Sequence, residues 1–400
     1  MLKKALYQYA SLFVIVTGAG GFFLANIILK EVLPPVEFGE LSLIITYLSL
    51  MYIFGIFGFE QVFMRLSEVH VQNVIVTQKS QLKVMVFTSV GTSVIAAICF
   101  RMLYPSIAVN FSLLLLGTFS MVSVMSLFTI FRLNSDFFIA QIIVNFWKIA
   151  LFLLALVILV FKQQLMMANA ILIVIITGFV VSFVYLKRHI RFQFTDKHST
   201  KEIFGYFYQF FISILIFSFL TFGDRFIFND MFGIAEFGNY YYLTNFFLAP
   251  FSIFQNYIGF KHLVKFKNSF DHIEFTRLTT KILGLGSILS IFLAAAALIS
   301  DHWQLLNFNF RNYTGAILIL LFIGITRLYY SAIAALLEAR ALKSTLKAVN
   351  FFYLTFLILF VSVSMAFIST ITHLVFVILV LWLSRCIVFR IILFRQLKDI

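Results

Sequence analysis

The sequence has 400 residues, of which 62% are hydrophobic and only 12% are charged, and its mean hydropathy is +1.03. A water-soluble domain could not bury that much apolar surface, whereas a bilayer requires helices with about 20 apolar residues each. The formal net charge of +14 would suit a nucleic-acid partner, but the basic residues are distributed as in membrane proteins, so no nucleic acid is expected. We predict an all-α polytopic membrane protein.

Apolar segments of spanning length follow one another along the whole chain. Lys3 and Lys4 precede an apolar run that is too long for a cleaved signal peptide, so the first segment is predicted to be retained. The twelve predicted transmembrane helices cover residues 6–29, 38–63, 84–104, 107–131, 137–161, 165–186, 203–228, 238–260, 282–300, 314–337, 348–368 and 371–394.

The distribution of Lys and Arg predicts the orientation. Most of them fall in the connections on one side of the predicted spans, and those on the other side are Lys30, Arg101, Lys162 and Arg311. An excess of basic residues marks the cytoplasmic side. We therefore predict that the N- and C-termini are both cytoplasmic, and that basic patches such as 187–191 and 261–267 touch anionic membrane lipids.

Two segments, 31–47 and 230–246, resemble each other at an offset of 199 residues. The first contains Glu37-Phe38-Gly39 and the second Glu236-Phe237-Gly238, and each follows the first predicted helix of its half. Many secondary transporters are built from such duplicated bundles.

The repeat predicts two pseudo-symmetric six-helix bundles, residues 1–186 and 203–400. A polar cytoplasmic linker, 187–202, is expected to join them. All other connections are short, so no soluble domain is expected on either side of the membrane.

The sequence has none of the usual catalytic or nucleotide-binding motifs. It contains no P-loop, no zinc-protease motif, no nucleophile elbow and no cluster of His, Cys and carboxylate residues at metal-ligand spacing. We therefore expect no catalytic residues, no metal and no bound cofactor.

Charged residues inside the predicted spans are the candidate functional residues, because such residues usually line a cavity or bind a substrate. Lys148 and Arg327 each lie roughly 15 Å from the nearest helix end. Together with Arg225 they are the candidate substrate-binding residues, although Arg327 could instead neutralise Glu60 or Asp224. These two acids are the candidates for coupling to a proton or a sodium ion. Arg385, in the last helix, is expected to reach the membrane surface as an interfacial anchor.

Two stretches of the sequence resemble the bacterial polysaccharide (O-antigen or capsule repeat-unit) flippases of the multidrug/oligosaccharidyl-lipid/polysaccharide exporter superfamily. In the first half, 32–42 with its Pro34-Pro35 pair is followed by Gly58-Phe59-Glu60. In the second half, Asp224-Arg225 is followed by Gly238-Asn239-Tyr240, which is similar to that family's Asp-Arg and Gly-x-Tyr pattern. The resemblance is spread over all twelve predicted helices, but its sharp motifs cover a small part of the chain.

The resemblance implies a flippase of the bacterial inner membrane that moves an undecaprenyl-diphosphate-linked oligosaccharide by alternating access. It would be a transporter and not an enzyme, with a glycan polymerase or a chain-length protein as expected partners. Two alternatives stay open at this point. One is a cation-coupled multidrug antiporter of the same superfamily, and the other is a membrane glycan polymerase or ligase, against which the absence of a long external loop argues.

Overall fold

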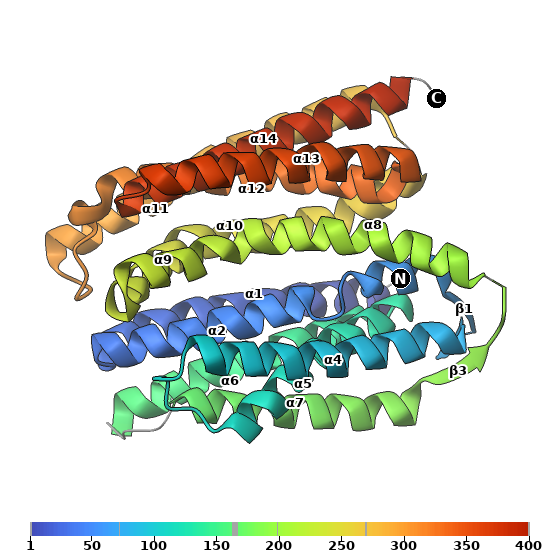
Figure 1. Cartoon of the computed structure of the whole chain (residues 1–400), viewed down its shortest axis with the longest axis horizontal. Helices are drawn as coiled ribbons and strands as arrows, with labels where there is room; N and C mark the ends of the chain where they lie inside the picture. Colours follow the sequence, from blue (N-terminus) through green and yellow to red (C-terminus); the bar gives the residue numbers. More distant parts are fainter. Residues whose placement is uncertain (1, 72, 162–166, 198, 269, 399–400) are drawn as a thin grey trace. The chain divides into compact units, whose positions relative to one another are not determined.

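The computed structural model describes residues 2–71, 73–161, 167–197, 199–268 and 270–398 (Figure 1). Lys162, which was assigned to an external connection, lies outside the described residues. The first part of the chain comprises α1 (Leu2–Val32), α2 (Pro35–Phe54), α3 (Phe59–Leu66), β1 (Glu68–Val71), β2 (Val74–Thr77), α4 (Lys79–Leu103), α5 (Phe111–Leu133), α6 (Phe137–Phe161), α7 (Met167–His189), β3 (Arg191–Phe194) and α8 (Thr200–Ser218). A π-helical segment (Phe219–Gly223) then leads to α9 (Asp224–Phe232), α10 (Ile234–Asn268), α11 (His272–Trp303), a 3₁₀ turn (Phe310–Tyr313), α12 (Thr314–Arg340), α13 (Lys343–Ser364), a second 3₁₀ turn (Met365–Phe367) and α14 (Ile371–Lys398).

The prediction of a polytopic helical membrane protein is confirmed. Within the described residues, eleven helices are long and apolar enough to cross a membrane. The predicted span at 238–260 has no counterpart among these eleven. It lies in α10, which has 35 residues but is more polar, with Asn239, Thr244 and Asn245 near its start. That α10 crosses the membrane as the twelfth span stays a prediction.

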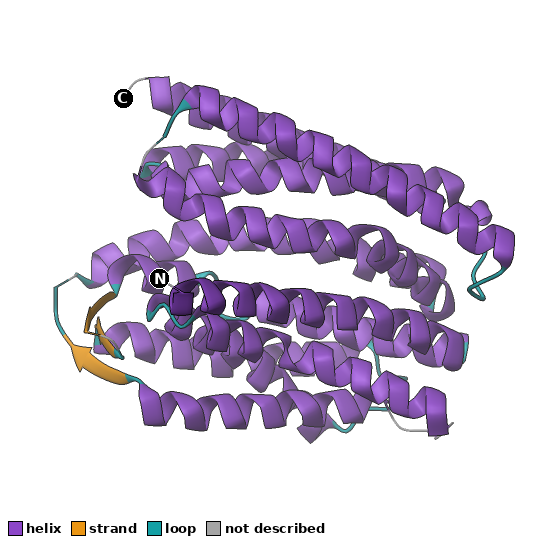
Figure 2. Ribbon diagram, turned by 180° about the vertical axis from the view of Figure 1, so that it is seen from behind, coloured by secondary structure: helices purple, strands orange, loops and turns teal. Residues whose placement is uncertain are grey.

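The expectation of a purely helical chain is wrong in one place. β1 pairs antiparallel with β2, and β2 pairs parallel with β3, so a three-stranded sheet forms at one end of the first helices (Figure 2). β3 occupies part of the predicted linker 187–202, which is therefore a paired strand over Arg191–Phe194 and not a continuous polar loop. The physical reason is that β-branched and aromatic side chains favour extended structure, and the strands satisfy one another's backbone hydrogen bonds.

The chain divides by its contacts into two compact units, Met1–Phe222 and Gly223–Ile400. This division falls after α8, because α8 packs against α2 and α3 of the first unit. The packing is close: Gly58 has a positive φ of 75°, and a Cβ atom there would come within 3.0 Å of the Phe210 backbone. The predicted bundles 1–186 and 203–400 were drawn from the sequence repeat and not from contacts. That the two bundles repeat each other in the membrane stays a prediction.

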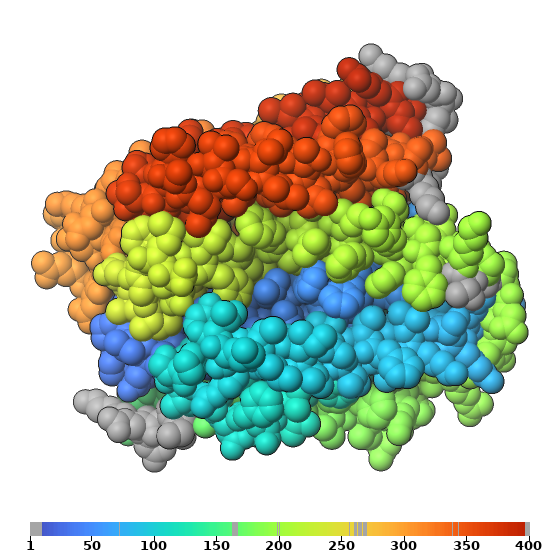
Figure 3. Space-filling model, in the orientation of Figure 1, coloured from blue at the N-terminus to red at the C-terminus, as the bar shows by residue number. Residues whose placement is uncertain are grey.

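In each unit one helix packs against several others. In the first unit this helix is α5, which packs against α2, α4, α6 and α7. In the second unit it is α12, which packs against α10, α11 and α14. Helices at the edge keep a broad apolar surface: α4, which forms the front of the first unit in Figure 3, exposes Phe87, Ile95 and Met102. Exposed apolar side chains along a helix of this length suit contact with lipid.

The two repeat segments begin equivalent helices at the predicted offset. α2 begins at Pro35 and α10 at Ile234, and the repeated tripeptide lies in the first turn of each. The glutamates are exposed in both copies, whereas Phe38 and Phe237 are buried, with 1% and 0% exposure. The two tripeptides thus take the same position and orientation on their helices.

A buried polar network joins the sheet to α4. The Thr77 hydroxyl donates to Oε1 of Gln81 over 2.9 Å, and the single proton of the Ser67 hydroxyl has two acceptors within reach, Oε1 of Gln81 at 3.0 Å and Oγ1 of Thr77 at 2.9 Å. All three side chains are buried. Their hydrogen bonds therefore replace water that the site excludes.

We predict that Gln81→Leu destabilises the first unit by about 1–3 kcal/mol, because the buried Thr77 hydroxyl loses its acceptor and Ser67 keeps only Thr77. The apparent Tm of the purified protein in detergent measures this effect. Lys83→Ala, at an exposed position on the same helix, is the control and is expected to change stability by less than about 0.5 kcal/mol. Equal Tm values for the two variants would contradict the role of the network.

Candidate functional site

The second unit contains a buried acidic residue at the start of α9. Asp224 follows the π-helical segment Phe219–Gly223 directly, and it is only 7% exposed. Tyr240 of α10 donates a short hydrogen bond from its hydroxyl to Oδ2 of Asp224. The ring of Phe228 stacks on Tyr240 with centroids 4.5 Å apart, which fixes the orientation of the tyrosine. Short π-helical segments within α-helices often occur at functional sites.

Two arginines lie near this carboxylate. Arg225 of α9 and Arg327 of α12 both interact electrostatically with Asp224, and they also interact with each other. Each guanidinium lies over an aromatic ring: Arg225 is 5.1 Å from the Tyr241 centroid, and Arg327 is 5.3 Å from the Trp382 centroid. Four helices, α9, α10, α12 and α14, therefore contribute to one charged cluster, which we call the Asp224–Arg327 cluster.

The Asp224–Arg327 cluster has an excess of positive charge, since two guanidinium groups face one carboxylate. Asp224 and Arg327 form no close ion pair in the part of the chain that the structure describes. There, Oδ1 of Asp224 and Nε of Arg327 also have no hydrogen-bond partner. Arg327 remains partly exposed, although it lies in the middle of its helix. The arrangement can accept an anionic group, because guanidinium groups bind phosphate and carboxylate oxygens through paired hydrogen bonds.

The remaining candidates lie in the first unit. Lys148, on α6, is partly exposed, and its Nζ donates to Oδ1 of the buried Asn145 over 3.3 Å. Glu60, on α3, is 7% exposed and interacts electrostatically with Tyr52, which also interacts with Arg132 of α5. The structure thus brings Asp224, Arg225 and Arg327 together, and it describes Lys148 and Glu60 in separate surroundings on α6 and α3.

The expectation that Arg385 reaches the membrane surface is wrong. Arg385 is 2% exposed, and its Nε donates to the Tyr330 hydroxyl over 2.8 Å. Its guanidinium carbon lies 4.8 to 5.5 Å from the ring centroids of Tyr330, Tyr353 and Phe389. The side chain is held by the aromatic faces of α12, α13 and α14 instead of extending to the interface. These aromatic partners are the residues that sequence reasoning missed.

Among the described residues, no group of three or more His, Cys, Asp or Glu side chains lies close enough to hold a metal ion.

The comparisons with known proteins bear on the fold. No family model and no curated protein matches the sequence. Three solved structures are similar over nearly the whole chain. The lipid II flippase MurJ in an inward closed conformation has a TM-score of 0.63 and 14% identity, covering 96% of this chain and 86% of that one. An outward-facing MATE family multidrug resistance transporter of the MOP superfamily has a TM-score of 0.58 and 13% identity, covering 97% and 94%. A mutant of the MATE transporter VcmN from Vibrio cholerae has a TM-score of 0.59 and 11% identity, covering 99% and 96%.

The chain therefore has the fold of these flippase and transporter structures. This is the fold that the sequence resemblance implies, while the family of polysaccharide flippases rests on the sequence resemblance alone. The similarity also fits a multi-pass membrane protein.

We predict that Tyr330→Phe lowers stability by about 1–3 kcal/mol, because Arg385 loses a hydrogen bond inside the protein. Tyr329→Phe is the matched control: its hydroxyl accepts a hydrogen bond from the exposed Arg390, so its loss should cost only about 0–1 kcal/mol. Thermal unfolding of the two purified variants in detergent compares the effects. A larger loss for Tyr329→Phe would show that Arg385 does not depend on Tyr330.

Proposed function

We propose that the protein is a flippase that moves an undecaprenyl-diphosphate-linked oligosaccharide from the cytoplasmic to the periplasmic leaflet of a bacterial inner membrane. The observation that carries this proposal is the excess positive charge of the Asp224–Arg327 cluster, with a partly exposed arginine at mid-helix. The similarity to the fold of a lipid II flippase supports it, as does the sequence resemblance to polysaccharide flippases.

The chemistry of the cargo fits the residues in this site. A lipid-linked diphosphate carries concentrated negative charge, and arginine recognises phosphate through two parallel hydrogen bonds. Arg327 and Arg225 are the groups that would hold the diphosphate, and Lys148 is a further cationic candidate in the first unit. Transport would proceed by alternating access, coupled to a proton or a sodium ion at Asp224 or Glu60. The two cytoplasmic termini, the twelfth span and a glycan polymerase or chain-length protein as partner belong to the same proposal.

The first test replaces Arg327. Arg327→Ala is expected to abolish export of the glycan, by at least about tenfold, while the protein still inserts into the membrane. Arg327→Lys should recover only part of the export, since an ammonium group cannot form the bidentate contact. Surface polysaccharide and the amount of membrane-inserted protein are measured together in a strain that depends on this gene.

The competing explanation is that Arg327 only neutralises Asp224. In that case Arg327→Ala would leave the buried carboxylate with Arg225 as its one remaining cation in the cluster, and the weaker compensation would reduce the amount of folded protein. The double variant Arg327→Ala/Asp224→Asn would then restore both the protein and the export. Normal export by a well-folded Arg327→Ala protein would refute the proposed role of this arginine in cargo binding.

A cation-coupled multidrug antiporter is the second candidate function. It is favoured by the similarity to two MATE transporter structures and by the buried Asp224, which could exchange a cation. Guanidinium groups outnumber carboxylates in the cluster. We therefore expect that an imposed proton or sodium gradient will not drive transport of the cationic dye ethidium by the reconstituted protein. Gradient-driven ethidium transport that is lost in Asp224→Asn would favour the antiporter instead.

A further inference from the structure

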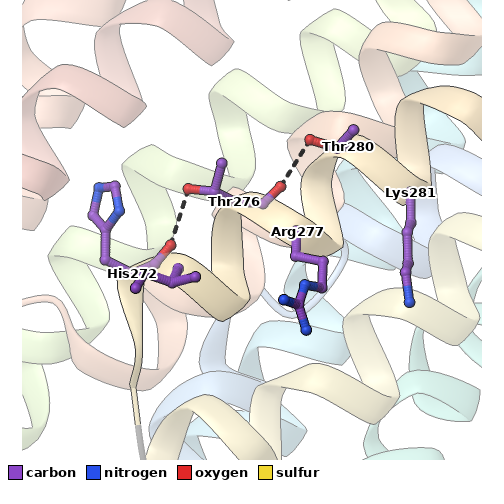
Figure 4. A pocket seen from close by; sticks show the side chains of 6 residues that line it. His272, Thr276, Arg277, Thr280 and Lys281 are labelled. Carbon is purple, nitrogen blue, oxygen red and sulfur yellow. Dashed lines mark hydrogen bonds between the residues drawn. The ribbon is translucent and has the colours of Figure 1, made fainter.

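A hollow of about 480 Å³ lies on the outside of the second unit, at the beginning of α11. It is lined by residues of this helix alone, namely His272, Ile273, Thr276, Arg277, Thr280 and Lys281. Figure 4 shows that the side chains of Arg277 and Lys281 extend to the same side of the helix. Thr276 and Thr280 use their hydroxyl protons on the helix itself, donating to the carbonyls of His272 and Thr276. The two cationic side chains are therefore the available donors of the hollow.

The length of α11 places these cations at the membrane surface. The helix has 32 residues, but its uninterrupted apolar stretch covers only 282–300. At 1.5 Å per residue this stretch is roughly 28 Å long, which matches the hydrocarbon thickness of about 30 Å. Lys281 then lies at the edge of the hydrocarbon, and Arg277 lies roughly 6 Å beyond it, at the level of the lipid headgroups.

The same face of the helix continues into an apolar surface. Gly284 lies one turn beyond Lys281, and a Cβ atom added there would meet nothing within 4 Å. Farther along, Leu285, Ile288 and Ile291 are 58%, 67% and 70% exposed. The basic hollow is thus followed along the helix by the open position at Gly284 and then by a strip of exposed aliphatic side chains.

The opposite side of α11 is the one that packs on the protein. A Cβ atom on Gly286 would come within 3.3 Å of Ile325 on α12, so this glycine allows close helix contact. Gly284 instead faces the outside, where its missing side chain leaves open space.

We propose that the hollow beside Arg277 and Lys281 binds the headgroup of an anionic phospholipid, whose acyl chains lie along the exposed face of α11. The charge fits a phosphate diester, the level fits the headgroup region, and the apolar strip fits the chains. Glu274 lies near the beginning of the same helix but does not line the hollow, so the lining residues themselves are basic. His272 adds a polar ring that also contacts Phe394 of α14, with centroids 5.0 Å apart.

The bound lipid would support a helix with few protein neighbours. α11 packs mainly on α12, with smaller contacts to α10 and to the 3₁₀ turn Phe310–Tyr313. A lipid held at its beginning would cover part of the face that no protein segment covers in the described structure. This role does not require transport, so it is independent of the proposed function.

Native mass spectrometry of the purified full-length chain tests the proposal, with phosphatidylglycerol and phosphatidylethanolamine of identical acyl chains as probes. The wild-type protein should retain at least one more phosphatidylglycerol than phosphatidylethanolamine molecule. Arg277→Gln/Lys281→Gln should lose this molecule. Gly284→Leu keeps every charge but places a bulky side chain in the open space between the hollow and the apolar strip, and it should lose most of the bound phosphatidylglycerol as well. Circular dichroism and size-exclusion chromatography check that each variant is folded.

The matched control removes two other exposed basic residues from the beginning of a helix, Lys79 and Lys83 of α4, which have the same spacing as Arg277 and Lys281. Lys79→Gln/Lys83→Gln has the same loss of charge but no hollow, and it should retain the selective lipid. The proposal is overturned if this control loses the lipid equally, since general surface charge would then explain the binding. It is also overturned if Gly284→Leu binds like the wild type, if both lipids are retained equally, or if equimolar farnesyl diphosphate displaces phosphatidylglycerol and thereby assigns the hollow to the cargo.

Discussion

The free-energy cost of keeping an ionised side chain inside a hydrocarbon layer governs how the second unit is built. Arg385 shows one solution: the guanidinium is surrounded by aromatic faces and donates to a tyrosine hydroxyl, so protein contacts replace water. Asp224 and Arg327 show another, in which opposite charges offset each other without a close ion pair. The tyrosines of α10 and α12 and the tryptophan of α14 contact these charged side chains directly. This explains why α10 is both buried and relatively polar.

The sequence predicted the helices because each must satisfy its own backbone hydrogen bonds in a bilayer, and this demands long apolar runs. The sequence did not predict the three-stranded sheet, because its strands have no such apolar runs. Glu68–Val71, Val74–Thr77 and Arg191–Phe194 lie outside the apolar runs, where hydropathy carries no structural information. The uninterrupted run of four β-branched residues in β2 was the available signal. Its parallel partner β3 begins 114 positions after the end of β2, and no local pattern predicts so distant a pairing.

The charged residues of the candidate site could be picked out from the sequence, but its aromatic residues and its geometry could not. Charge within an apolar run identified Asp224, Arg225 and Arg327 from the sequence alone. Counting residues along a helix gives the depth of a side chain but not the direction in which it points. For this reason Arg385 was expected at the interface, although it lies in the interior among Tyr330, Tyr353 and Phe389. The partners of a buried charge come from other helices, and helix packing decides which ones they are.

The difference between Arg327 and Arg385 follows from what surrounds each of them. Both lie near the middle of long helices, yet Arg385 is enclosed, whereas Arg327 has one ring beneath it and part of its side chain exposed. An enclosed arginine can stabilise the bundle but cannot reach a ligand without unpacking three helices. Arg225 and Arg327 would repel each other if no negative charge were near. The carboxylate of Asp224 supplies that negative charge. A single carboxylate beside two guanidinium groups keeps the empty site tolerable, and it leaves enough positive charge to attract a diphosphate.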